Sequence, residues 1–131
     1  MTESAGGEHA GTMSISDVAE RTGLSTHTLR YYEREGLMFA PVDRASSTHR
    51  RYTEADLNWV TFLTKLRMTS MPIAKIREYV ELARHGEDST AERLELLLIH
   101  RMNVERQLEE VTASLAAISH KIGIYQERLS A

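Results

Sequence analysis

The chain has 131 residues and a formal net charge of −3, a size typical of one small domain with an extension. It contains no cysteine, which excludes disulfides, thiolate metal sites and thiol redox switches. No apolar run is long enough to span a bilayer, and acids and glycines stand where a signal peptide would be basic and apolar. We therefore expect a globular, cytoplasmic protein without a membrane partner.

Positive charge is concentrated in the first two thirds of the chain. Residues 14–85 contain eleven Lys and Arg against nine Asp and Glu, whereas residues 86–131 contain five against eight. Strong nucleic-acid binders usually carry a larger basic surplus. The net charge therefore does not identify a nucleic-acid partner, and the evidence must come from where individual Lys and Arg residues lie.

Two segments come before the most informative stretch. Residues 1–12 are rich in Gly, Ala and Glu and lack periodicity, which predicts a disordered leader. Ser16 suits the N-cap of a first short helix, and Gly23 can end it. The residues expected to face inward from this helix are Val18, Ala19 and Leu24.

A second short helix is expected between Ser25, a good N-cap residue, and Gly36, which can end it in a left-handed turn. Two short helices joined by a tight turn with a glycine form a helix-turn-helix, in which the second helix reads DNA. Helical spacing places Leu29 and Tyr32 on one side. The opposite side carries His27, Arg30, Tyr31 and Arg34.

The cationic side suits a nucleic-acid groove, because guanidinium groups are planar multi-donors and phosphate oxygens are acceptors. An ordinary amphipathic helix with a solvated basic face is the alternative.

The segment after Gly36 favours the nucleic-acid interpretation of this helix. Two short extended runs around a polar loop predict a hairpin over residues 37–52, with Pro41 on an edge strand. Its cations are Arg44, His49, Arg50 and Arg51.

A hairpin of this kind after a helix-turn-helix indicates a wing that reaches the DNA backbone beside the groove. A solvated, Arg-rich hairpin is the alternative.

Residues 53–56 have the spacing of a capping box and begin a third helix. Pro72 suits the first position of a fourth helix, which Gly86 ends. The residues expected to face inward from these two helices are Leu57, Val60, Leu63, Leu66, Ile73, Ile76, Val80 and Ala83.

Three aromatic residues on the third and fourth helices, Trp59, Phe62 and Tyr79, are expected to pack in the core. Aromatic residues at helical spacing are usually packing residues, and a small-molecule pocket lined by the three is the alternative.

The last third of the chain predicts one long helix. Residues 89–92 have the spacing of another capping box, and the following residues show a heptad seam with alternating steps of three and four. A helix of this length, about 60 Å, exposes more apolar surface than so small a chain can cover. The seam residues are Leu94, Leu97, Arg101, Val104, Leu108, Val111, Leu115, Ile118, Ile122, Tyr125 and Leu129.

This seam predicts a coiled-coil homodimer. The core dimerisation residues are expected to be Leu97, Val104, Leu108, Val111, Leu115, Ile118 and Ile122. Arg101 is the polar seam residue and is expected to fix the register or to pair with an acid of the partner. A hairpin that folds back on the same chain is the alternative, but no turn signal occurs before Gly123.

Four runs of sequence resemble the MerR family of bacterial transcriptional regulators. They are residues 15–19 (ISDVA), 28–37 (TLRYYEREGL), 50–53 (RRYT) and 71–76 (MPIAKI). The resemblance implies a mainly α fold, with a winged helix-turn-helix followed by a long antiparallel coiled-coil dimerisation helix. We accordingly expect a leader over residues 1–12, a DNA-binding domain over 13–86 and a dimerisation helix over 87–131.

The resemblance also implies a function. The family's dimer binds a palindromic promoter element and acts on RNA polymerase through the promoter, by bending and untwisting the DNA. The DNA contacts would fall on Thr26, His27, Arg30, Tyr31, Arg44, His49 and Arg50. The family often has an aromatic residue at the position of His49. A DNA-binding architectural or adaptor protein without an effector, similar to excisionases, is the alternative.

No catalytic constellation or Gly-rich phosphate loop is present in the sequence, so we expect neither an enzyme nor a cofactor. The family's metal sensors use cysteines, which this chain lacks, and its multidrug sensors use a large C-terminal domain. Three possibilities therefore stay open for the effector. It is a small ligand between the fourth helix and the partner's coil end near Tyr125, it is oxidation of Met68 or Met71, or the protein has no effector. Metal binding by His85, His100 and His120 is a weaker alternative, and we expect no metal site.

Overall fold

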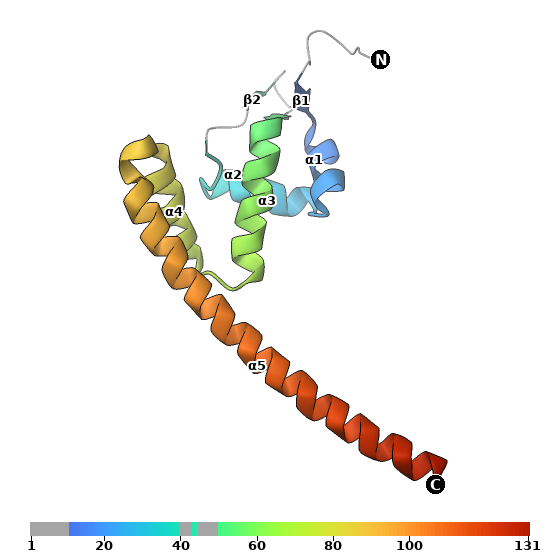
Figure 1. The fold of residues 1–131 in the computed structure, drawn as a ribbon. Helices are drawn as coiled ribbons and strands as arrows, with labels where there is room; N and C mark the ends of the chain where they lie inside the picture. The colour runs from blue at the N-terminus through green and yellow to red at the C-terminus, as the bar shows by residue number, and fades with distance from the viewer. Residues whose placement is uncertain (1–10, 40–42, 45–49) are drawn as a thin grey trace. The chain divides into compact units, whose positions relative to one another are not determined.

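The computed structural model describes residues 11–39, 43–44 and 50–131 (Figure 1). It divides into two compact units, Met1–Arg93 and Leu94–Ala131, which are described separately. The elements in order are β1 (Thr12–Met13), α1 (Ile15–Thr22), α2 (Thr26–Arg34), β2 (Asp43–Arg44), β3 (Arg50–Thr53), α3 (Glu54–Met68), α4 (Ile73–Arg84), the 3₁₀ turn η3 (Gly86–Ser89) and α5 (Thr90–Ser130). The expected mainly helical fold is confirmed.

A small antiparallel sheet of strand order β1-β3-β2 accompanies the helices. Asp43 and Arg44 pair with Arg51 and Arg50, so a hairpin is present. Residues 37–39, which were expected in its first extended run, belong to no strand. The Pro41 edge position lies outside the described residues. Strand β1 was not expected: Thr12, assigned to the disordered leader, pairs with Thr53. A two-residue strand has no periodicity to read, and it exists only through its pairing with β3.

The first helix begins two residues earlier than expected. Its N-cap is Ser14, not Ser16, and the Oγ of Ser14 accepts a hydrogen bond from the Asp17 N–H at 3.1 Å. The Asp17 carboxylate in turn accepts from the Ser14 N–H at 3.2 Å. This reciprocal capping box satisfies two N–H groups at once, whereas Ser16 lies exposed in the first turn. Gly23 ends the helix at φ 78°, as expected.

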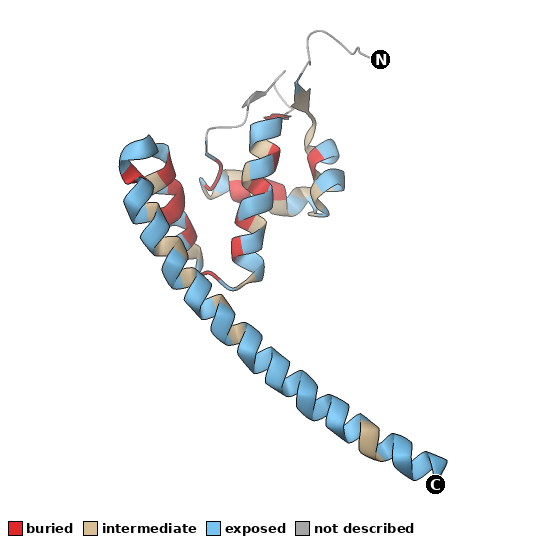
Figure 2. Cartoon of the chain, in the orientation of Figure 1, coloured by how far each residue is buried: buried red, intermediate tan, exposed pale blue. Residues whose placement is uncertain are grey.

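The core of the first unit lies between α1, α2, α3 and α4, where the buried positions of Figure 2 are concentrated. All four predicted inward residues of α3 are buried, and Ile76, Val80 and Ala83 of α4 are buried as well. Val18 of α1 is fully buried, at 0% exposure. The apolar stripes on these helices therefore face one another, as their spacing predicted.

The N-termini of α3 and α4 test the two helix-start residues predicted from the sequence. The Thr53–Asp56 capping box is present, with the Thr53 N–H donating to the Asp56 carboxylate at 2.9 Å. Pro72 is the N-cap of α4 rather than its first helical residue. Its backbone is extended, with ψ 146°, and its carbonyl accepts from the N–H of Lys75 and of Ile76.

The second predicted capping box, at residues 89–92, is wrong. Ser89 lies in η3 with 3% of its surface exposed, and its hydroxyl donates to the carbonyls of Leu82 and Gly86. The hydroxyl oxygen accepts from Arg93 Nε at 3.0 Å. Ser89 thus joins α4 to the first turn of α5 instead of capping a free helix end.

The last helix, α5, is continuous over 41 residues, and Gly123 lies inside it. The alternative of a hairpin folding back within this segment is therefore excluded. Seam residues are exposed in the single chain: Leu108 and Val111 are each 64% exposed and Leu115 is 60% exposed. Within the part of the chain that the structure describes, no helix is long and apolar enough to cross a membrane.

Candidate nucleic-acid interface

Helix α2 is supported from one side only. Leu29 and Tyr32 face the core with 1% and 4% exposure, and burial of a leucine side chain contributes roughly 1.5–3 kcal/mol. The Tyr32 hydroxyl lies 3.5 Å from Thr64 Oγ1 of α3. These contacts fix the rotation of α2 about its own axis, so the opposite side of the helix is held towards solvent.

The outward side carries the residues that the sequence predicted. His27 and Arg30 are exposed, whereas Thr26 and Tyr31 are half-buried. At 100° per residue these four positions span an arc of about 140°, which is narrow enough to face a single groove. A helix of this kind presents guanidinium, imidazole, hydroxyl and phenol donors to base edges and phosphates.

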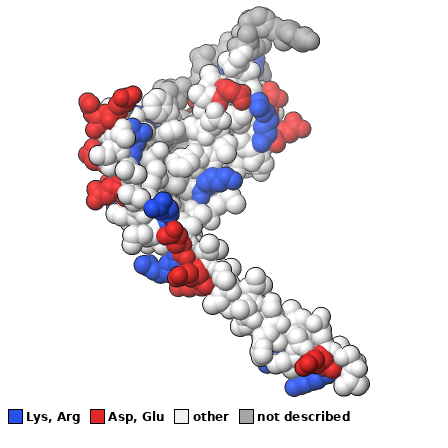
Figure 3. Space-filling view, in the orientation of Figure 1, with Lys and Arg blue, Asp and Glu red and all other residues white. Residues whose placement is uncertain are grey.

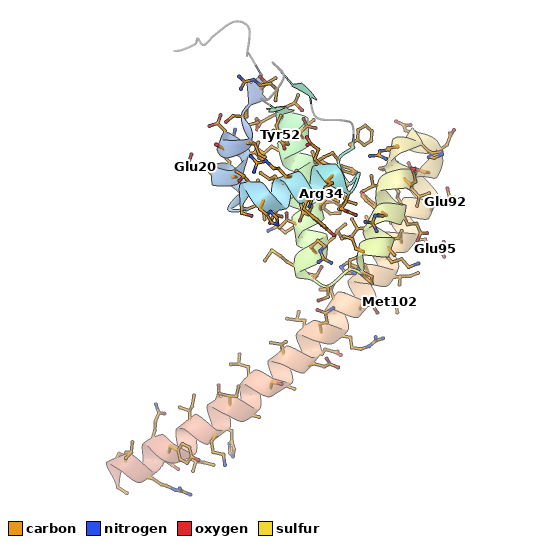
Figure 4. All side chains as sticks on the ribbon, turned by 180° about the vertical axis from the view of Figure 1, so that it is seen from behind. Glu20, Arg34, Tyr52, Glu92, Glu95 and Met102 are labelled. Carbon is orange, nitrogen blue, oxygen red and sulfur yellow. The ribbon has the colours of Figure 1, made fainter. Side chains whose placement is uncertain are left out.

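Arg34 belongs to the same side and was placed there by helical spacing, although it is not among the seven predicted DNA contacts. Figure 4 shows it near the C-terminal end of α2. Its guanidinium carbon lies 5.9 Å from the centre of the Tyr31 ring, a cation–π contact. The contact orders both side chains without using the guanidinium N–H donors.

Both ends of α2 are fixed by local sequence. Ser25 is the N-cap, and its Oγ accepts from the Thr28 N–H at 3.0 Å. At the other end Gly36 has φ 72°, a left-handed conformation that favours glycine. Nothing lies within 4 Å of a Cβ built on Gly36, so backbone conformation rather than space requires glycine there.

The predicted wing is described in part. The backbones of Arg44 and Arg50 are cross-strand partners in the β2–β3 pair, so these two predicted DNA contacts share one register position. His49, the third predicted wing contact, lies outside the described residues. On the face drawn in Figure 3, basic and acidic side chains are interspersed, as expected from the small basic surplus.

The aromatic residues of α3 and α4 pack against one another. The rings of Trp59 and Tyr79 stack at a centroid distance of 6.0 Å, and Phe62 lies 5.7 Å from Tyr79. Phe39 meets the Trp59 ring edge-on at 5.4 Å. The expected core position holds for Tyr79, which is 8% exposed, but not for Phe62, which is 37% exposed at the edge of the cluster. The ring contacts favour packing over a ligand pocket.

The structure also bears on the proposed signal sites. Met68 is 74% exposed, whereas Met71 is 2% exposed and shielded from an oxidant. The Nδ1 atom of His85 lies 2.9 Å from the Glu81 carbonyl oxygen. Among the residues that the structure describes, no group of three or more His, Asp and Glu is arranged to hold a metal ion.

Comparison with known proteins decides the family. The model of the MerR helix-turn-helix family regulatory proteins matches residues 13–83, and a second model, described as MerR, DNA binding, matches residues 57–121. The chain belongs to the MerR family. This MerR-family chain is thus a DNA-binding transcriptional regulator and, as predicted, not an enzyme.

Individual relatives match this chain over most of their length. An uncharacterized helix-turn-helix regulator of Haemophilus influenzae is 34% identical over 116 residues, which cover 88% of this chain and 85% of the relative. The uncharacterized regulator YyaN of Bacillus subtilis is 38% identical over 116 residues, covering 77% of this chain and 83% of YyaN.

A solved structure is similar as well. The crystal structure of HiNmlR, a MerR family regulator lacking the sensor domain and bound to promoter DNA, has a TM-score of 0.81 to this MerR-family chain at 35% identity. The match covers 88% of this chain and 86% of that chain. The order of helix-turn-helix, small wing and long C-terminal helix is therefore that of a MerR regulator.

Proposed function

We propose that this chain binds a palindromic promoter element as a homodimer and distorts the DNA between the half-sites to control transcription. The outward side of α2, with Arg30 and His27 exposed above a buried Leu29, carries this proposal. The similarity to HiNmlR, whose crystal structure contains promoter DNA, supports it. RNA polymerase would be affected indirectly, through the promoter, in the cytoplasm.

The exposed seam of α5 supports the homodimer. Six of its residues, from Leu108 to Tyr125, are each between 49% and 64% exposed in the single chain, and a second copy would remove this apolar surface from water. Two copies also join two weakly basic heads into one ligand, which raises affinity without new contacts.

Charge favours the antiparallel arrangement of the two helices. Residues 90–110 carry five Glu against three Arg, whereas residues 111–130 carry Lys121 and Arg128 against Glu127. An antiparallel pair sets the acidic half of each helix beside the basic half of the other, but a parallel pair sets like beside like. Complementary charge of this kind selects orientation more than it adds stability.

A dimer with two-fold symmetry requires an operator with the same symmetry. Phosphate contacts position such a dimer but carry little sequence information, so discrimination would depend on how easily the operator centre deforms. Bending a site of this length costs on the order of 1–6 kcal/mol. A small change in the angle between the two heads is therefore enough to decide whether the distortion occurs.

The test is selection of duplexes from a random-sequence pool by the purified protein, followed by footprinting and by transcription from a promoter that carries the selected site. We expect an inverted repeat and a change in transcript level. Selection of no sequence would refute the proposal. An asymmetric site without any effect on transcription would favour an architectural or adaptor protein instead.

A further inference from the structure

The segment that follows α2 is held by one arginine of α4. Residues 36–39, here termed the connector, lead from the end of α2 towards the wing and belong to no helix or strand. Arg84 Nη2 donates to the Gly36 carbonyl at 3.0 Å and also to the Met38 carbonyl, and Arg84 Nε donates to the Phe39 carbonyl at 3.1 Å. One guanidinium therefore holds three carbonyls of the connector.

The fourth carbonyl of the connector has a partner in α3. The Trp59 indole N–H donates to the Leu37 carbonyl at 2.7 Å. Leu37 and Met38 are 1% and 2% exposed, so their side chains anchor the same segment in the core. All four successive carbonyls of the connector thus accept hydrogen bonds from side chains, in a stretch without secondary-structure partners.

A second arginine of α4 reaches the end of α2 itself. Arg77 Nη2 forms an ion pair with the carboxylate of Glu35, the C-cap residue of α2. Arg77 and Arg84 are seven residues apart, so they lie on the same side of α4. This side of α4 therefore faces both the end of α2 and the connector, and Figure 4 shows α4 next to the end of α2 marked by Arg34.

The C-terminal end of α4, which carries Arg84, is also joined to the first turn of α5. Arg93 donates to Ser89 Oγ at 3.0 Å and to the Gly86 carbonyl at 3.1 Å, and Ser89 donates to the Leu82 carbonyl of α4. These residues belong to the same compact unit as α2. Hydrogen bonds thus link the start of α5, through α4 and Arg84, to the connector after α2.

We propose that Arg84 is a positioning residue for DNA recognition, which holds α2 and the start of the wing in a fixed orientation relative to α4. The inference rests on the proposed DNA-binding function. A guanidinium suits this role because its planar fork offers donors in several fixed directions, whereas the ammonium of lysine acts as a single point charge. Arg84 itself makes no DNA contact in this assignment.

The test compares Arg84→Met and Arg84→Lys with Lys75→Met. Lys75 provides the matched control because it lies on the same helix and carries the same charge. Among the residues that the structure describes, its ammonium pairs only with Glu78, at 3.3 Å, on an exposed surface. The probe is the duplex selected by the wild-type protein, beside a scrambled duplex of equal length. Fluorescence anisotropy at several salt concentrations gives the affinity, and calorimetry gives the melting temperature.

We expect Arg84→Met to weaken binding to the selected duplex by about tenfold, the equivalent of roughly 1.4 kcal/mol. Binding to the scrambled duplex, which depends on phosphate contacts, and the slope of affinity against salt should stay at their wild-type values. Arg84→Lys should fall between wild type and Arg84→Met. Lys75→Met should bind as wild type does.

Three results would overturn the inference. Wild-type affinity of Arg84→Met would show that the connector needs no such support. A salt slope reduced by about two increments of 0.9, one for each copy in the dimer, would make Arg84 a direct phosphate contact. Equal weakening on both duplexes would make its role purely structural. If Arg84→Met does not fold, Arg84→Lys at a near-native melting temperature decides, and wild-type affinity of that variant overturns the inference. Failure of the wild-type protein to select any duplex would instead refute the proposed function.

Discussion

The hydroxyl of Ser25 accepts a hydrogen bond from the Thr28 N–H at 3.0 Å, at the N-terminus of the helix proposed to read DNA. Replacing Ser25 with alanine leaves this N–H without its partner. We expect Ser25→Ala to lower the free energy of unfolding by about 1 kcal/mol. Urea denaturation of the variant and the wild type measures the difference.

Ser25→Asp separates stability from DNA binding. A carboxylate caps a helix as well as a hydroxyl does, and its charge is favourable at a helix N-terminus, so the free energy of unfolding should be retained or increased. The same negative charge would repel DNA phosphates near the start of α2. We expect lower operator affinity in an anisotropy titration, and undiminished affinity would place this helix end away from the DNA backbone.

The turn between α3 and α4 provides a second test of stability. Ser70 has φ 72°, and its N–H donates to the Arg67 carbonyl at 3.0 Å. A left-handed conformation costs a residue with a Cβ roughly 1–2 kcal/mol, and glycine avoids most of this cost. We expect Ser70→Gly to raise the free energy of unfolding by about 1 kcal/mol.

Ser70→Ala is the control for that substitution, because alanine retains the Cβ and removes only the hydroxyl. Its free energy of unfolding should match that of the wild type. If glycine and alanine shifted the urea midpoint equally, the gain would not come from the backbone conformation at this position.

Features that depend on local spacing were predictable from the sequence. The buried stripe of α3 follows from apolar residues three or four positions apart, and the Thr53–Asp56 capping box lies within four residues. Strand β1 was missed because its pairing partner, β3, is distant in sequence. Ser89 was misassigned because its partners Leu82 and Gly86 lie before it, whereas the capping-box pattern looks only at the residues that follow.

In the candidate site too, residues placed by local spacing were predictable, whereas a residue defined by distant contacts was not. Helical spacing identified the outward side of α2, since the positions of Leu29 and Tyr32 in the sequence already indicate which side of the helix packs. Arg84 could not be identified from the sequence. Its acceptors are backbone carbonyls 45 to 48 residues earlier in the chain, and a carbonyl carries no residue-type signal. The sequence thus predicts the proposed DNA-facing surface better than the contacts proposed to orient it.

The seam of α5 predicts a clear result for one charged substitution. Leu108 is 64% exposed in the single chain, and a dimer would bury it, so Leu108→Asp would place a carboxylate in an apolar interface. An unpaired buried charge costs several kcal/mol. We expect a monomer at micromolar concentration by analytical ultracentrifugation, together with loss of operator binding.

Ala113→Asp is the matched control, since Ala113 lies on the same helix but off the seam and is exposed. It should remain dimeric and bind the operator. Dimerisation of Leu108→Asp with an unchanged association constant would refute the seam as the interface.

Arg30 and Arg50, on α2 and β3, test the DNA contacts themselves. Each arginine that neutralises a phosphate contributes about 0.9 to the slope of log affinity against log salt on B-DNA. We expect Arg30→Ala and Arg50→Ala each to weaken operator binding and to flatten this slope, in a dimer by about two such increments because both copies lose the contact. Arg106→Ala, which removes an exposed arginine of α5 that hydrogen-bonds Asn103 at 3.5 Å, should leave the slope unchanged. Unchanged affinity in both Arg30→Ala and Arg50→Ala would contradict the assignment of α2 and the wing as the DNA-reading elements.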